Sequence, residues 1–248
     1  MIILKQVRLG ASMSWALVAL VLTIHSIGAA AEPFELQVYG DYKRMSETGD
    51  TGGKVRLASV AEKPNTYGVG ALAGLRGEVL VWDGKVLVSP GHDKDGRVAP
   101  ATSSDEATLL TMATVAEWTE VDIPSDLKQA EFQGFVLQEA RRRGLVDSVP
   151  YPFLVKGAFP RVTWHVVTGT MPGHGGHGGA ANAQSRNFEQ KAAEGVIVGF
   201  YSGDRLEGVI SHTGERFHVH FASTDLSVSG HVEDYEVGKG SKLLLPLR

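Results

Sequence analysis

Three histidines near the C-terminal end of the chain are spaced so that they could bind one metal ion. His218 and His220 belong to the alternating segment 216–221 (Arg-Phe-His-Val-His-Phe), so on a β-strand both side chains lie on the same face. His231 follows beyond a turn-rich segment, 223–230. If the two segments pair as a hairpin, His231 lies opposite the first two histidines. Three neutral imidazoles with open coordination positions suit a catalytic Zn²⁺ or a related divalent transition-metal ion.

The absence of cysteine limits the other chemistry that is open to the chain. With no Cys among its 248 residues, the sequence excludes disulfides, thiolate zinc sites, iron–sulfur clusters and cysteine nucleophiles. Any metal must therefore be bound by His, Asp or Glu, and the chain has nine histidines. A cross-strand histidine cluster without metal is the alternative for His218, His220 and His231, because so short a motif also arises by chance.

A second histidine group lies in the glycine-rich segment 172–179 (Pro-Gly-His-Gly-Gly-His-Gly-Gly). Its glycines leave the backbone unconstrained, so His174 and His177 are not held in a fixed geometry by the local sequence. This composition favours a surface loop. The alternative is a loop that collects metal or closes over the first site.

Glu78 is a candidate acid–base residue. It begins a strand whose same face also carries Leu80 and Trp82, so its carboxylate could be partly buried. A buried carboxylate has a raised pKa and can transfer protons near neutral pH. The alternative is a glutamate at the edge of the sheet, exposed to water.

The elements that must position these residues are mainly short strands. Segment 78–88 predicts a β-hairpin, because two β-branched runs flank the turn dipeptide Asp83-Gly84. Segment 126–143 predicts the one clear helix, with Asp126 as its cap and Gln129 placed to reciprocate. Further strands are expected at residues 36–39, 153–155, 162–167, 196–200, 209–211, 217–221 and 231–237, and polar loops at 45–54 and 90–106.

These elements predict an α/β fold of the α+β type, with few helices. We expect two sheet-rich subdomains with mixed sheets: residues 32–148, which end in the helix, and residues 149–248, which carry the histidine site. The composition agrees with a folded chain, since 43% of the residues are apolar. With 21% charged residues and a net charge of −4, the chain has no general affinity for nucleic acid.

Residues 1–31 have the pattern of a signal peptide. Lys5 and Arg8 precede the apolar stretch 15–24, and the small residues 28–31 offer a cleavage site after Ala31. The apolar stretch is much shorter than the about 20 residues that a membrane-spanning helix needs. We therefore expect an exported protein, periplasmic or secreted, with no membrane segment after cleavage.

Several segments together resemble the bacterial α-acetolactate decarboxylases. Residues 67–78 (Tyr-Gly-Val-Gly-Ala-Leu-Ala-Gly-Leu-Arg-Gly-Glu) and the following hairpin are similar to the family's Gly-x-Gly-Thr-Phe and Leu-Asp-Gly-Glu segment. Residues 217–225 are similar to its His-x-His-Phe-x-x-x-Asp motif, and residues 229–234 to its Gly-Gly-His block. Residues 153–157 and 195–200 resemble two further family strands.

The resemblance implies a reaction and a role for each candidate residue. It implies that His218, His220 and His231 hold Zn²⁺ and that Glu78 handles protons beside the metal. The substrate would be 2-acetolactate or a related 2-hydroxy-3-keto acid, converted to acetoin and CO₂. Loss of CO₂ leaves two electrons that are delocalised as an enediolate, and zinc stabilises this charge as a Lewis acid. Family members also suggest a homodimer.

The chain departs from the family pattern at three places. Ala71 stands where the family has a threonine, and His165 stands where it has a substrate-binding arginine; Arg161 could supply the missing charge. The family's second glutamate, on a C-terminal tail, has no match up to Arg248. Two alternatives therefore stand beside the decarboxylase: a periplasmic metal-binding homologue without activity, and a three-histidine zinc hydrolase or hydratase.

Overall fold

The computed structural model describes residues 33–60, 63–170 and 183–247. Residues 32–248 form one compact unit. The expected signal peptide, His174 and His177 lie outside the described residues. In the part of the chain that is described, no helix combines the length and the apolar character needed to cross a membrane.

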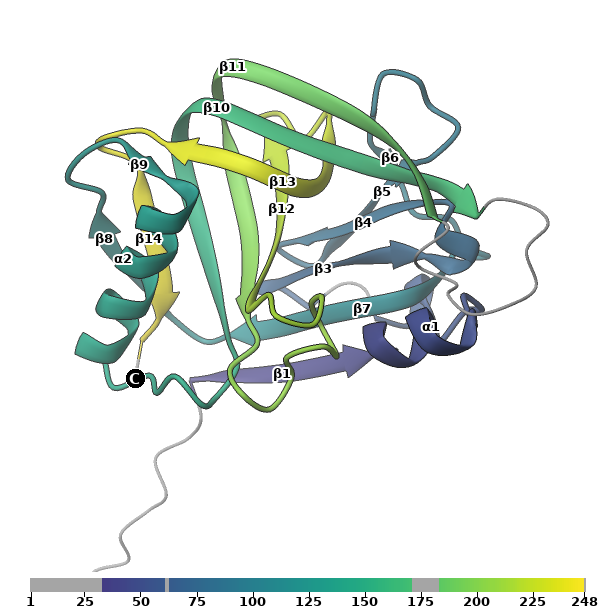
Figure 1. The fold of residues 1–248 in the computed structure, drawn as a ribbon, viewed down its shortest axis with the longest axis horizontal. Coiled ribbons are helices and arrows are strands. Elements are labelled where there is room, and N and C mark those ends of the chain that lie inside the picture. Colours follow the sequence, from purple (N-terminus) through teal and green to yellow (C-terminus); the bar gives the residue numbers. More distant parts are fainter. Residues whose placement is uncertain (1–32, 61–62, 171–182, 248) are drawn as a thin grey trace, which may run out of the picture. The chain divides into compact units, whose positions relative to one another are not determined.

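The first half of the compact unit builds a seven-stranded sheet, and Glu78 lies on one of its inner strands (Figure 1). The strands along the sheet are β1 (Phe34–Tyr39), β7 (Glu106–Val115), β3 (Thr66–Leu72), β4 (Gly77–Trp82), β5 (Lys85–Pro90) and β6 (Ala99–Pro100), with β2 (Val55–Arg56) paired to β7. The predicted hairpin is present as β4 and β5. Asp83 and Gly84 both have positive φ, 48° and 79°, as a two-residue hairpin turn requires.

The second half builds another seven-stranded sheet, which carries the histidines. Its order is β8 (Trp118–Asp122), β14 (Lys242–Pro246), β10 (Tyr151–Thr170), β11 (Ala183–Tyr201), β12 (Phe217–Ser223), β13 (Ser229–Val237) and β9 (Leu127–Lys128). Because β13 also pairs with β10, the strands β10, β11, β12 and β13 close into a ring. This closure brings residues of β10 beside those of β12 and β13.

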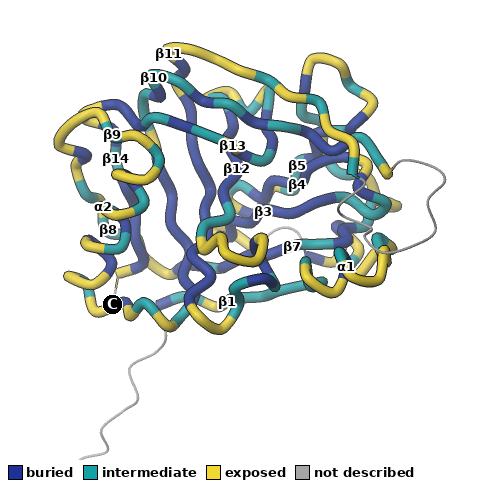
Figure 2. Tube along the Cα trace, viewed as in Figure 1, coloured by how far each residue is buried: buried dark blue, intermediate teal, exposed yellow. Residues whose placement is uncertain are grey.

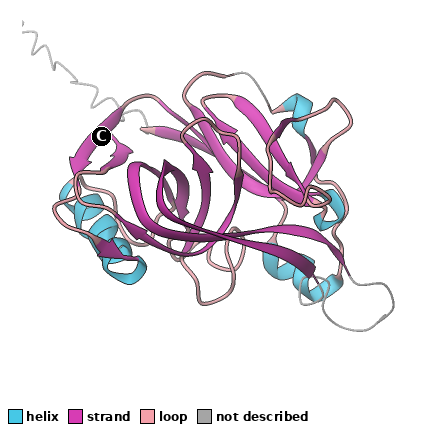
Figure 3. Cartoon of the chain, turned by 90° about the horizontal axis from the view of Figure 1, so that it is seen from above, coloured by secondary structure: helices cyan, strands magenta, loops and turns pink. Residues whose placement is uncertain are grey.

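Helices are few, as expected. Within residues 33–60, 63–170 and 183–247 they are α1 (Tyr42–Thr48), α2 (Gln129–Arg142) and two short 3₁₀ turns, η1 (Leu57–Ser59) and η2 (Ala73–Leu75). Viewed from above, strands make up most of the described chain and the helices lie at its margins (Figure 3). The predicted fold class, α+β with two sheets and few helices, is confirmed.

The long helix begins later than predicted. Residues 127–128 form β9 and pair with β13, so the helix starts at Gln129 instead of near Asp126. The Asp126 carboxylate accepts the backbone N–H of Lys239, and Glu131 accepts the N–H of Lys128 at the helix start. A strand pairing formed with a distant segment has therefore overridden the local capping signal.

Four further features differ from the sequence-based expectations. The chain passes from the first sheet to the second between β7 and β8, before residue 118, whereas the boundary was expected near residue 148. The helix α2 therefore packs on the second sheet and does not belong to the first. Every pairing between the described strands is antiparallel, whereas mixed sheets were expected. Short connections favour antiparallel pairs, because parallel pairs need long crossover connections. Residues 209–211, expected as a strand, lie in a turn-rich segment, and α1 occupies part of the expected loop 45–54.

Buried apolar side chains join the two sheets and fix their relative position. Val69 and Leu80 of the first sheet share a cluster with Leu154, Val198 and Phe200 of the second. These five side chains are buried, and β3, β4 and the segments of β10 and β11 around Leu154 and Val198 are dark blue in Figure 2. Close packing of this kind holds Glu78, on the first sheet, against the histidine strands of the second.

Candidate metal centre and active site

The three predicted histidines converge at the β12–β13 hairpin. His220 lies directly opposite His231 in the pairing of these strands, and His218 lies two residues from His220 on the same face. One ring nitrogen from each histidine lies within 4.8 Å of the corresponding nitrogens of the other two. The predicted hairpin and its shared face are therefore present in the structure.

The chemistry of this group fits a divalent metal ion. Burial lowers the pKa of His218 to about 4, and it holds the pKa values of His220 and His231 well below their ordinary value. At neutral pH the rings are therefore uncharged, which is the form that binds metals. His220 is fully buried, and neither of its ring nitrogens has a hydrogen-bond partner among the described residues. A bound ion would satisfy one of these nitrogens.

Glu78 reaches the histidine group from the other sheet. Its side chain is on the same face of β4 as Leu80, as predicted, and only 4% of the residue is exposed. The Glu78 Oε2 atom lies 3.7 Å from Nε2 of His220, and Oε1 lies 3.9 Å from Nε2 of His165. Burial raises the pKa of Glu78 to about 8, although the backbone N–H of Val167 donates a hydrogen bond of 3.2 Å to Oε1 and opposes the shift. In the protein without bound metal, the carboxyl is therefore largely protonated at neutral pH.

The raised pKa of Glu78 predicts a pH-dependent stability in protein without bound metal. Between the ordinary value of 4.5 and about 8, the folded state binds more protons than the unfolded state. The free energy of unfolding contributed by Glu78 therefore falls as pH rises through this window, by up to about 1.4 kcal/mol per pH unit. Urea titrations at about pH 5 and about pH 8 measure the loss, and the Glu78→Gln protein should lack it. Equal losses in both proteins would contradict a buried, titrating Glu78.

His165, which the resemblance aligned with a substrate-binding arginine, also lies at the three-histidine group. It is on β10 directly opposite His231, and the centroids of the two rings are 4.9 Å apart. Burial lowers the pKa of His165, while the nearby Glu233 carboxylate acts in the opposite direction. Its Nδ1 atom contacts Glu233, and its Nε2 atom faces Glu78.

Arg161 does not take the place of the missing arginine. Its guanidinium pairs with the carboxylates of Asp234 and Glu189 on the neighbouring strands. It does not line the pocket beside the histidines. Among the described residues that line this pocket there is no Lys or Arg.

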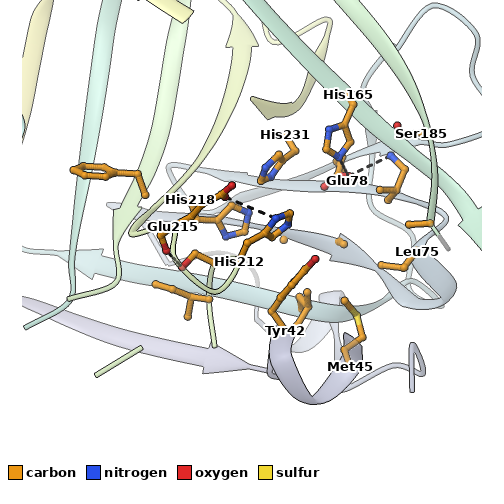
Figure 4. Close-up of a pocket in the computed structure, with 18 residues that line it drawn as sticks. Tyr42, Met45, Leu75, Glu78, His165, Ser185, His212, Glu215, His218 and His231 are labelled. Atoms are coloured by element: carbon orange, nitrogen blue, oxygen red, sulfur yellow. Dashed lines mark hydrogen bonds and ion pairs between the residues drawn. The ribbon is translucent and has the colours of Figure 1, made fainter. Parts of the chain in front are cut away.

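The pocket is a cavity of about 200 Å³ between the two sheets, with a polar and an apolar part. Figure 4 shows Glu78, His165, His218 and His231 directed toward one another at one part of the pocket, with Met45 and Leu75 at another. Met45 and Leu75 pack with Ala71 and Val167 in one apolar cluster. The pocket is thus large enough for a small organic molecule that has oxygen atoms at one end and methyl groups at the other.

Three further pocket residues were not singled out by the sequence. Tyr42 comes from α1, and His212 and Glu215 come from the turn-rich segment that follows β11. The His212 ring stacks on Tyr42 with centroids 4.3 Å apart, and it lies parallel to the His231 ring at 6.2 Å. No local motif marks these residues, because the packing of segments that are distant in the sequence brings them together.

Comparison with known proteins finds similarity to alpha-acetolactate decarboxylases. A family model described as alpha-acetolactate decarboxylase matches residues 47–244. The alpha-acetolactate decarboxylase of Bacillus licheniformis is 27% identical over 179 residues, which cover 72% of this chain and 66% of the relative. That of Streptococcus thermophilus is 26% identical over 193 residues, which cover 76% of this chain and 75% of the relative. The chain thus spans slightly less than two thirds of the first relative's length and three quarters of the second's.

A solved structure has the same fold. The crystal structure of alpha-acetolactate decarboxylase from Bacillus subtilis strain 168 matches with a TM-score of 0.68, over 86% of each chain. The sequence identity in this comparison is 17%, so the likeness concerns the fold.

Proposed function

Because the chain belongs to the alpha-acetolactate decarboxylase family, we propose that it converts 2-acetolactate, or a related 2-hydroxy-3-keto acid, to acetoin and CO₂. The cofactor in this proposal is a divalent metal ion, Zn²⁺, held by His218, His220 and His231. One observation carries the proposal: a buried Glu78 carboxyl lies 3.7 Å from His220 of the three-histidine group, beside a pocket.

The three histidines would hold the ion, and Glu78 would donate the proton that replaces CO₂ on the substrate carbon. When bound, the ion supplies a Lewis acid that stabilises negative charge developing on the substrate oxygens. Breaking the bond to the carboxylate releases CO₂ and leaves an electron pair, which the adjacent carbonyl accepts. The protonated Glu78 then gives its proton to the carbon that lost CO₂, and water returns a proton to Glu78. Each turnover therefore consumes one proton and releases one CO₂.

Other pocket residues would orient the substrate. His165 replaces the family's arginine and, in our proposal, contacts the polar end of the substrate beside Glu78. An imidazole lacks the planar, permanently charged guanidinium of arginine, so we expect His165 to bind a substrate carboxylate more weakly than an arginine would. Ala71, Leu75 and Val167 would contact the methyl groups.

The direct experiment measures CO₂ and acetoin from racemic 2-acetolactate with purified, Zn²⁺-loaded protein. Equal amounts of both products, above the spontaneous rate, support the proposal. No acetoin at saturating substrate, with zinc bound stoichiometrically, rejects it and leaves the metal-binding homologue. Hydrolysis of an ester or hydration of CO₂ without decarboxylation would instead favour the zinc hydrolase or hydratase.

We also propose that the protein is exported after cleavage at Ala31 and acts in the periplasm or the medium, on the pattern of residues 1–31. A homodimer is our proposal from the family alone. Cell fractionation tests the first point, since protein found only in the cytoplasm at full length would contradict it. Light scattering of the purified protein tests the second.

A further inference from the structure

Glu233 occupies an irregular position on β13. In the pairing of β10 with β13, Thr163 lies opposite Asp234, whereas the next residue, Trp164, lies opposite Val232. Glu233 is therefore the extra residue of a β-bulge and has no residue opposite it. Bulges redirect side chains and are common beside active sites.

The bulge places the Glu233 carboxylate against His165. A Glu233 oxygen contacts Nδ1 of His165, and the side chain of Glu233 is 57% exposed, whereas that of His165 is 16% exposed. The other ring nitrogen, Nε2, faces the buried Glu78 at 3.9 Å. One nitrogen of His165 thus faces an outer carboxylate, and the other faces the pocket.

We propose that Glu233 is a positioning residue that accepts the Nδ1–H of His165 and thereby directs Nε2 into the pocket. An ionised carboxylate can only accept hydrogen bonds, so the ring nitrogen that it contacts must carry the hydrogen. A carboxylate of this kind fixes both the rotation of an imidazole and the position of its hydrogen. The bulge is the structural reason why a residue of β13 can reach the Nδ1 side of a ring on β10.

The consequence for catalysis rests on the proposed function. With the ring fixed, Nε2 is the atom that His165 presents to a substrate and to Glu78. Without Glu233, the ring is free to rotate or to carry its hydrogen on Nε2. The nitrogen that faces the pocket would then donate a hydrogen bond instead of accepting one. We expect the Glu233→Ala protein to lose about 10- to 100-fold in kcat/KM for decarboxylation, while its metal content stays the same.

Nitrogen-15 NMR tests the positioning itself, without reference to activity. The wild-type protein and its Glu233→Ala, Glu233→Asp and Glu233→Gln variants are labelled at histidine nitrogen, and the His165 signals are identified by their loss in a His165→Gln protein. We expect hydrogen on Nδ1 of His165 in the wild type and a shift toward hydrogen on Nε2 in Glu233→Ala. Glu233→Asp and Glu233→Gln, which keep an acceptor, should lie between the two. Glu236→Ala, on the same strand, should match the wild type.

Two results would overturn the proposal. A wild-type His165 with hydrogen on Nε2 contradicts it at once, without any variant. So does a Glu233→Ala protein whose His165 signals equal those of the wild type. The NMR measurement does not depend on catalytic activity. If the protein proved inactive, the proposed function would be rejected, and the NMR spectra would still test the role of Glu233.

Discussion

His220→Ala is expected to abolish stoichiometric metal binding and, with it, decarboxylation. His220 is the buried member of the three-histidine group, and it lies directly opposite His231. Two imidazoles that are left without it cannot complete the ligand set that a catalytic zinc site needs. Loss of a residue that merely orients a ligand already costs about 10- to 100-fold in metal affinity, so loss of the ligand itself should exceed about 100-fold. Metal per chain after dialysis, and calorimetric titration with Zn²⁺, measure the effect.

The matched control is His92→Ala. His92 lies in an exposed turn after β5 and does not line the pocket. This variant should bind one metal ion per chain with wild-type affinity and keep wild-type activity. A His220→Ala protein that is folded by circular dichroism and binds Zn²⁺ as tightly as the control would refute the three-histidine site.

A second large loss of activity is expected for the Glu78→Gln protein. Glutamine has nearly the same shape, and its amide oxygen can still accept the N–H of Val167, so the fold should be kept. It has no acidic proton to give to the carbon that loses CO₂. Acid–base catalysis by one side chain contributes about 10²- to 10⁴-fold, so we expect kcat to fall by a factor in that range. Steady-state kinetics at saturating substrate, with metal content measured on the same sample, separate this loss from a loss of metal.

Glu215→Gln is the control for this change. Glu215 is the other glutamate that lines the pocket, but its side chain is 61% exposed and it pairs with His212 at 3.8 Å. We expect less than about a tenfold change in kcat for this variant, because the proposal gives the proton transfer to Glu78 and an exposed side chain is not held beside the three histidines. If Glu78→Gln kept wild-type kcat with metal bound, the proton would have to come from another group.

Local sequence patterns predicted the parts of the site that depend on one strand or one hairpin. A strand alternates its side chains with a period of two, so the faces of His218, His220 and Glu78 followed from their neighbours. Asp83-Gly84 predicted its turn because both positions need positive φ. If the segments on either side of residues 223–230 form a hairpin, His231 must lie opposite the first two histidines. The structure contains this hairpin, and His231 pairs with His220.

The rest depends on contacts between distant segments. Gly157 and Pro160 favour an interruption of the strand, yet β10 continues through both for twenty residues. It does so because β11 pairs with it from end to end. The contact between His165 and Glu233 depends on a bulge, which shifts register by one residue and leaves no clear local signal. Tyr42 and His212 reach the pocket only because the two sheets pack against each other.

The most direct test of the account is a crystal structure of the Zn²⁺-loaded protein, with anomalous scattering recorded on both sides of the zinc absorption edge. We predict one strong anomalous peak per chain, bound by a ring nitrogen from each of His218, His220 and His231, with Glu78 beside it. A peak at His174 and His177 instead, or no peak at the three histidines in protein that binds zinc stoichiometrically, would contradict the account.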